Sequence, residues 1–100
     1  MTDRELLELA AKAHSGLVYL PELGWIHEDP HGVRGSWWNP LADDGDALRL
    51  AVKLELDVMC ASVQSIEDGV AVAIEAGTNP CAATRRAIVR AAAEIGRSMG

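Results

Sequence analysis

The sequence has no phenylalanine and one tyrosine, so three tryptophans must supply most of its aromatic side chains. Its two cysteines, Cys60 and Cys81, are too few and too far apart for the disulfide framework of a small secreted protein. No apolar run approaches the roughly 18 residues of a membrane span, and no basic segment followed by an apolar one opens the sequence. We therefore expect a reduced, cytoplasmic protein without a membrane segment.

The apolar content of 49% overstates the bulk available for a core, because sixteen of those residues are alanine. The remaining larger apolar side chains suffice for one compact domain, which would bury roughly 65% of its extended-chain surface. We expect a single domain over residues 1–100. The alanines predict helices that pack closely against their neighbours.

Charge is unevenly distributed within a net charge of −6. Residues 81–100 are basic because they contain Arg85, Arg86, Arg90 and Arg97, whereas the rest of the chain is acidic. An acidic protein is a poor general nucleic-acid binder. The arginines either complement the negative end of a helix dipole or form a local surface for nucleic acid.

Three segments have the features of helices. Thr2 or Asp3 can cap a first helix that ends near Ala13, and a second is expected over residues 44–55. Apolar residues cover most of the second helix, which predicts that it is largely buried. Asn79 and Pro80 have the chemistry of a cap and a first helical position, and they predict a final helix.

Strands are predicted in the remaining segments. Residues 17–38 contain short apolar runs broken by turns, and residues 57–64 and 70–76 are expected to form a hairpin joined at Asp68-Gly69. The order is helix, strands, helix, hairpin, helix. It predicts an α+β fold, with a mainly antiparallel sheet and packed helices in a layered α/β sandwich.

Two polar segments resemble metal sites. Residues 27–31 match the zinc-protease pattern H-E-x-x-H, but the pattern requires a helix and Pro30 opposes one, so a polar turn is expected. The acidic run Asp43 to Asp46 lacks the ligand spacing of a calcium loop and suits a helix start. A metal-dependent hydrolase using His27, His31 and these carboxylates is the weakest functional hypothesis. We assign no metal ligand, catalytic residue or cofactor.

Trp37 and Trp38 are the most unusual local feature. Adjacent residues of a strand point to opposite faces, so the two rings are expected to separate. Our first interpretation is that both rings fill core, one on each face. The second is a partner surface, and the third is a platform on which a base or sugar stacks.

Three segments resemble one known family. They are residues 38–54 (WNPLADDGDALRLAVKL), residues 5–13 (ELLELAAKA) and residues 79–93 (NPCAATRRAIVRAAA). Together they are similar to the phage ABA sandwich domain family, a group of small phage and prophage proteins. The resemblance covers about half of the sequence and implies a three-layer helix–sheet–helix domain in a bacterial host. It implies no activity and no catalytic residue.

The leading functional hypothesis is a phage or prophage accessory protein that acts as a non-catalytic interaction module. Its partner would be a second copy of the chain, as in a homo-oligomer, or a phage or host protein. The alternative is a nucleic-acid-associated or DNA-mimic accessory protein. The candidate interaction surface comprises Trp37, Trp38, Asn39, Arg86, Arg90 and Arg97.

Overall fold

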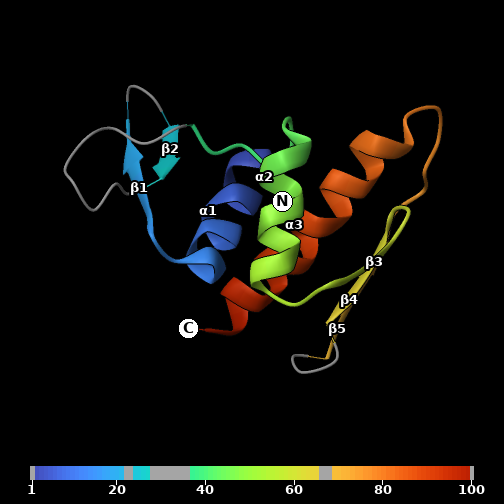
Figure 1. Ribbon diagram of the computed structural model, residues 1–100. Helices are drawn as coiled ribbons and strands as arrows, with labels where there is room; N and C mark the ends of the chain where they lie inside the picture. Colours follow the sequence, from blue (N-terminus) through green and yellow to red (C-terminus); the bar gives the residue numbers. More distant parts are fainter. Residues whose placement is uncertain (1, 22–23, 28–36, 66–68, 100) are drawn as a thin grey trace.

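The computed structural model describes residues 2–21, 24–27, 37–65 and 69–99 (Figure 1). The elements in chain order are α1 (Asp3–His14), β1 (Leu17–Leu20), β2 (Gly24–His27), α2 (Asp44–Lys53), β3 (Asp57–Met59), β4 (Ser62–Ser65), β5 (Val70–Ala73) and α3 (Pro80–Ser98).

Helix α3 is the centre of the structure. It contacts α1, α2 and all three strands of the β3–β4–β5 sheet. Figure 1 shows α1 on the side of α3 away from this sheet, with the β1–β2 hairpin beyond α1. The predicted α+β fold with antiparallel strands is confirmed. Its layers run sheet, α3, α1, which differs from the helix–sheet–helix order that the family resemblance implies.

The helix starts follow from local capping. Thr2 accepts a hydrogen bond from the Glu5 backbone at 3.2 Å, and the Glu5 carboxylate accepts one from the Thr2 backbone, which completes a capping box. Asn79 accepts from the backbone of Ala82 at 3.0 Å, and Pro80 takes the first position of α3 as predicted.

Helix α2 departs from its prediction in length and burial. It ends at Lys53 instead of Glu55, whose φ of +54° is incompatible with a helix. Leu48 and Val52 are 62% and 68% exposed, so the prediction of a largely buried helix is wrong. One stripe of α2, including Leu50 and Ala51, reaches the core, and nothing in the described chain covers the stripe with Leu48 and Val52.

Helices α1 and α3 approach unusually closely. A Cβ atom built on Gly96 would lie 1.9 Å from the Leu9 carbonyl oxygen, so the two backbones meet there without an intervening side chain. Ala10 and several alanines of α3 are fully buried. The close packing that the alanine content predicts is therefore confirmed for this pair of helices.

The three-stranded sheet corrects the predicted hairpin. Residues 57–64 do not form one strand, because the chain turns at Cys60 and Ala61 and returns as β4. Val63 of β4 pairs with Val58 of β3 and with Val72 of β5, which ends at Ala73. Ala61 has a φ of +56° at this turn. The predicted turn residue Asp68 lies outside the described residues.

The tryptophan-rich segment forms a separate two-stranded sheet. β1 pairs antiparallel with β2, and Ile26 of β2 makes an isolated bridge to Trp37. Strands are thus confirmed in the described part of residues 17–38. In the H-E-x-x-H motif, His27 ends β2, and residues 28–31, including His31, lie outside the part of the chain that the structure describes.

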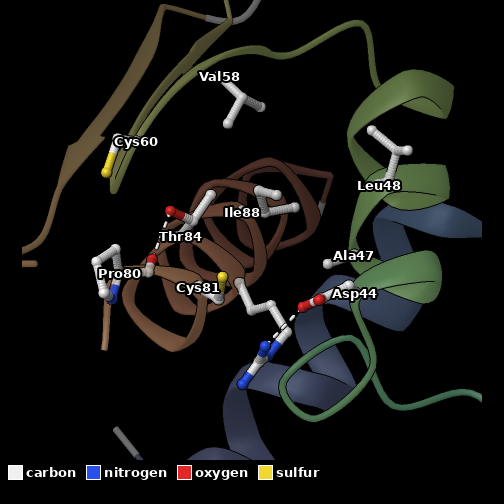
Figure 2. Close-up of a pocket in the computed structure, with 10 residues that line it drawn as sticks. Asp44, Ala47, Leu48, Val58, Cys60, Pro80, Cys81, Thr84 and Ile88 are labelled. Atoms are coloured by element: carbon white, nitrogen blue, oxygen red, sulfur yellow. Dashed lines mark hydrogen bonds and ion pairs between the residues drawn. The ribbon is translucent and has the colours of Figure 1, made fainter. Parts of the chain in front are cut away.

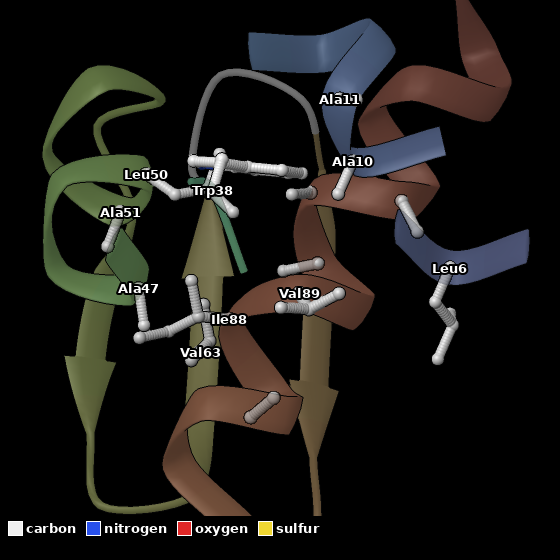
Figure 3. Close-up of a cluster of buried hydrophobic side chains, with 14 residues drawn as sticks. Leu6, Ala10, Ala11, Trp38, Ala47, Leu50, Ala51, Val63, Ile88 and Val89 are labelled. Carbon is white, nitrogen blue, oxygen red and sulfur yellow. The ribbon is translucent and has the colours of Figure 1, made fainter. Parts of the chain in front are cut away.

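The main core gathers side chains from all three helices and β4 (Figure 3). Leu6 and Ala10 come from α1, Leu50 from α2, Val89 from α3 and Val63 from β4. Trp38 joins them from the segment that precedes α2, and it supplies the largest side chain of the cluster. This ring, with the partly buried Trp25 packed against the cluster, supplies bulk in a sequence that has no phenylalanine.

Candidate functional site

Trp37 and Trp38 differ sharply in burial, which agrees with the alternation expected of adjacent residues, and only one ring is buried. Trp38 is 3% exposed and packs in the core, whereas Trp37 is 63% exposed. The interpretation that both rings fill core is wrong for Trp37. The prediction that Trp38 belongs to an interaction surface finds no support in its burial, because only 3% of the residue is exposed and it belongs to the core cluster.

Buried contacts fix the backbone beneath Trp37. The Trp38 backbone N–H donates to the Trp25 carbonyl at 2.9 Å. The ring of Trp38 stands edge-on to His14, with ring centroids 5.7 Å apart. Burial lowers the pKa of His14 below its usual 6.5, and a hydrogen bond to the Ser15 carbonyl opposes that shift in part.

Asp46 ties the same segment to the start of α2. Its buried carboxylate accepts a hydrogen bond from the Asn39 backbone at 2.9 Å and one from Arg49 at 2.9 Å. His27 Nε2 lies 3.7 Å from the same carboxylate. Asp43 caps α2 by accepting from the Asp46 backbone at 2.8 Å, so the expected helix-start role of this acidic run is confirmed.

Two hollows flank the exposed Trp37 ring. One of about 280 Å³ is largely apolar and includes Tyr19, whose ring centroid lies 5.0 Å from that of Trp25. The other, of about 300 Å³, includes charged side chains. Its lining consists of Trp37, Asn39, Asp43, Asp46 and Arg49. We call the exposed faces of Trp37, Tyr19, Asn39 and Arg49 the Trp37 surface. It presents one large ring between an apolar and a charged depression.

The arginines of α3 do not form one free basic stripe. Arg86 donates to Asp3 of α1 at 3.0 Å, and Arg97 lies 3.9 Å from Glu94. Arg85 donates to Asp44 at 2.6 Å and to the Leu41 carbonyl at 2.9 Å. Arg90 alone of the four makes no ion pair with another described residue. Two of the four arginines therefore join α3 to α1 and α2, which leaves less free positive charge on α3 for contact with nucleic acid.

A third hollow, of about 350 Å³, lies between α2, α3 and β3 (Figure 2). Leu48 and Val58 face it from α2 and β3, and Ile88 from α3. Both cysteines line it as free, exposed thiols. Sequence reasoning missed this groove because its walls come from three separate segments. The available signal was the pair Leu48 and Val52, two apolar residues one turn apart on a helix whose other face already supplies the core.

Metal chemistry finds no support in the described parts of the chain. No three side chains of His, Cys, Asp or Glu within them are grouped so that they could hold a metal ion. His27 lies beside Asp46, and His31 falls outside the described residues. The carboxylates of Asp43 and Asp46 are used in capping and in holding Asn39.

None of the described helices is both long enough and apolar enough to cross a membrane. Comparisons with protein-family models, with curated proteins and with solved structures found no match for the chain.

Proposed function

We propose that the chain is a non-catalytic interaction module that binds a protein partner through the Trp37 surface. The observation that carries the proposal is the 63% exposure of Trp37 on a backbone that Trp38, Asn39 and Asp46 hold in place. Tryptophan is enriched at protein interfaces, where its large ring gains the most from leaving water.

The energetics favour a protein partner. Burying the exposed part of a tryptophan removes on the order of 150 Å² of surface from water, which favours binding by about 4 kcal/mol before the costs of association. Because the segment is already ordered by buried contacts, little conformational entropy is lost on binding. Tryptophan and arginine are also the side chains most often found at the energetic centre of interfaces, and Arg49 lies beside Trp37.

The resemblance of residues 38–54 to a phage family supports the choice of partner. It favours a phage or host protein met in the cytoplasm of a bacterial host. The apolar groove between α2 and β3 supports the same functional class, because it offers a second surface for contact beside α2.

The test compares capture by three immobilised proteins from a bacterial lysate: the wild type, Trp37→Ala and Met59→Ala. Met59 is 79% exposed on the three-stranded sheet, so its variant removes a similarly exposed apolar side chain away from the Trp37 surface. We expect at least one lysate protein to be retained equally by wild type and Met59→Ala. Trp37→Ala should retain about tenfold less of that protein.

Circular dichroism must show that all three proteins are folded. If every captured protein is retained equally by Trp37→Ala and wild type, the Trp37 surface is not the binding site and the proposal fails.

A further inference from the structure

Strand β5 forms one edge of the three-stranded sheet, with β4 on its other side. The Ile74 backbone N–H donates to the carbonyl of the directly opposed Ala61 at 2.8 Å, which marks this pair as a hydrogen-bonding position of the ladder just beyond β5. Hydrogen-bonding positions alternate along an antiparallel ladder, so the backbone N–H and C=O groups of Val72 face Val63 of β4. The backbone N–H and C=O groups of Ala71 and Ala73 therefore face away from β4.

This outer edge is accessible. A hollow of about 420 Å³ runs along residues 69–73 and is bounded on α3 by Arg90 and Glu94. Protein edges are usually protected by lysine, proline or a bulge, and β5 (VAVA) has neither lysine nor proline. The opposite edge, β3, has three residues and faces α2 across the groove. A partner strand therefore has its best access at β5.

We propose that a second copy of the chain pairs its β5 antiparallel with this β5, which joins the two sheets into one of six strands. A two-fold interface requires a surface that is complementary to itself. Arg90 and Glu94 meet this requirement because they lie one turn apart beside the same strand. A two-fold axis reverses their order, so Arg90 of each copy faces Glu94 of the other.

The local contacts and side chains agree with this occupant. Within the described parts of the chain, Arg90 makes no ion pair, and the one ion pair of Glu94 is the long 3.9 Å pair with Arg97. Val70 and Val72 alternate with Ala71 and Ala73, whose small side chains do not obstruct a strand laid beside them. A strand carrying charge of one sign would place a like charge opposite either Arg90 or Glu94, which is why we infer a second copy.

The main test measures mass by sedimentation over a protein concentration series. We expect wild type to approach twice its monomer mass of 10.7 kDa as concentration rises. Arg90→Glu and Glu94→Arg should each weaken the dimer about tenfold, because each places like charges across the interface. The double variant restores opposite charges and should restore the dimer.

Arg4→Glu is the matched control, since Arg4 and Glu8 form a similarly spaced pair on α1, away from β5. It should dimerise as wild type does. Ala71→Pro removes an outward N–H without breaking the ladder to β4, and we expect it to be monomeric. If that variant fails to fold, the charge variants still decide the question.

This inference is independent of the Trp37 surface, so Trp37→Ala should leave the dimer intact. The inference is overturned if wild type stays monomeric at every concentration, or if both single charge variants dimerise as wild type does. Loss of the dimer in Trp37→Ala with normal dimers in the charge variants would also overturn it, and would place self-association on the Trp37 surface.

Discussion

Replacing Gly96 with alanine should destabilise the fold, although alanine is the better helix former. The new Cβ would lie 1.9 Å from the Leu9 carbonyl oxygen and 2.8 Å from the Leu9 carbonyl carbon. Real Cβ atoms essentially never come within 3.0 Å of such neighbours. Both atoms belong to backbone, so no side chain can rotate away, and α1 and α3 must separate by about 1 Å.

The magnitude follows from two opposing effects. Alanine gains about 1 kcal/mol in helix propensity over glycine. A separation of about 1 Å loses a quarter to a half of the dispersion energy along the contact, and overpacking typically costs about 1–3 kcal/mol or more. Because the contact joins the backbones of the two helices, we expect a net loss of about 2 kcal/mol. That loss corresponds to a melting temperature lower by about 8–16 °C.

Urea and thermal unfolding of wild type, Gly96→Ala and Gly45→Ala would measure this effect. Gly45 is the control because it also lies in a helix, and its added Cβ would meet flexible Arg49 and Asp43 atoms at 3.2 Å. Gly45→Ala should be neutral or more stable by up to about 1 kcal/mol. Equal stability of Gly96→Ala and wild type would show that the helices separate freely, and would refute the reasoning.

Three further outcomes can be measured by unfolding. Trp38→Ala should lower the free energy of unfolding by about 3–5 kcal/mol because the Trp38 ring fills the core. Trp37→Ala should change it by less than about 1 kcal/mol because the Trp37 ring is exposed. Similar losses in the two variants would contradict the difference in burial. Asp46→Ala should lower the free energy of unfolding by about 1–3 kcal/mol because the Asn39 N–H loses its acceptor. An unchanged urea midpoint would show that this hydrogen bond does not stabilise the fold. Burial lowers the pKa of His14, so its contribution to the free energy of unfolding is complete above pH 6.5 and is lost as pH falls through the folded-state pKa. His14→Gln should therefore flatten the plot of unfolding free energy against pH in this range.

Local chemistry made much of the fold predictable. Thr2 and Asn79 mark their helix starts through side chains that bond within three residues, so the signals lie in a short window of sequence. The turn at Ala61 could not be predicted, because alanine is not a residue that favours positive φ. Its conformation accompanies a tertiary contact, in which the Ala61 N–H donates to the Thr84 hydroxyl of α3 at 2.9 Å.

The candidate site was only partly predictable for a similar reason. The alternation of side chains along a strand correctly predicts that Trp37 and Trp38 differ in their surroundings, but it does not predict which ring is buried in the core. That choice depends on His14 and Leu50, which come from other elements. Asp46 was expected to start a helix, and its bond to Asn39 appears only when the preceding segment folds back on α2.

The central position of α3 has a consequence for how the protein is made. Of the described elements, α3 leaves the ribosome last, yet α1, α2 and the sheet all pack against it. Until it emerges, Leu6 and Val63 lack the helix that joins their elements, and α1 must wait for a partner about 80 residues away in sequence. The nascent chain therefore cannot complete this core until α3 has emerged, and the apolar surfaces that α3 covers stay exposed until then.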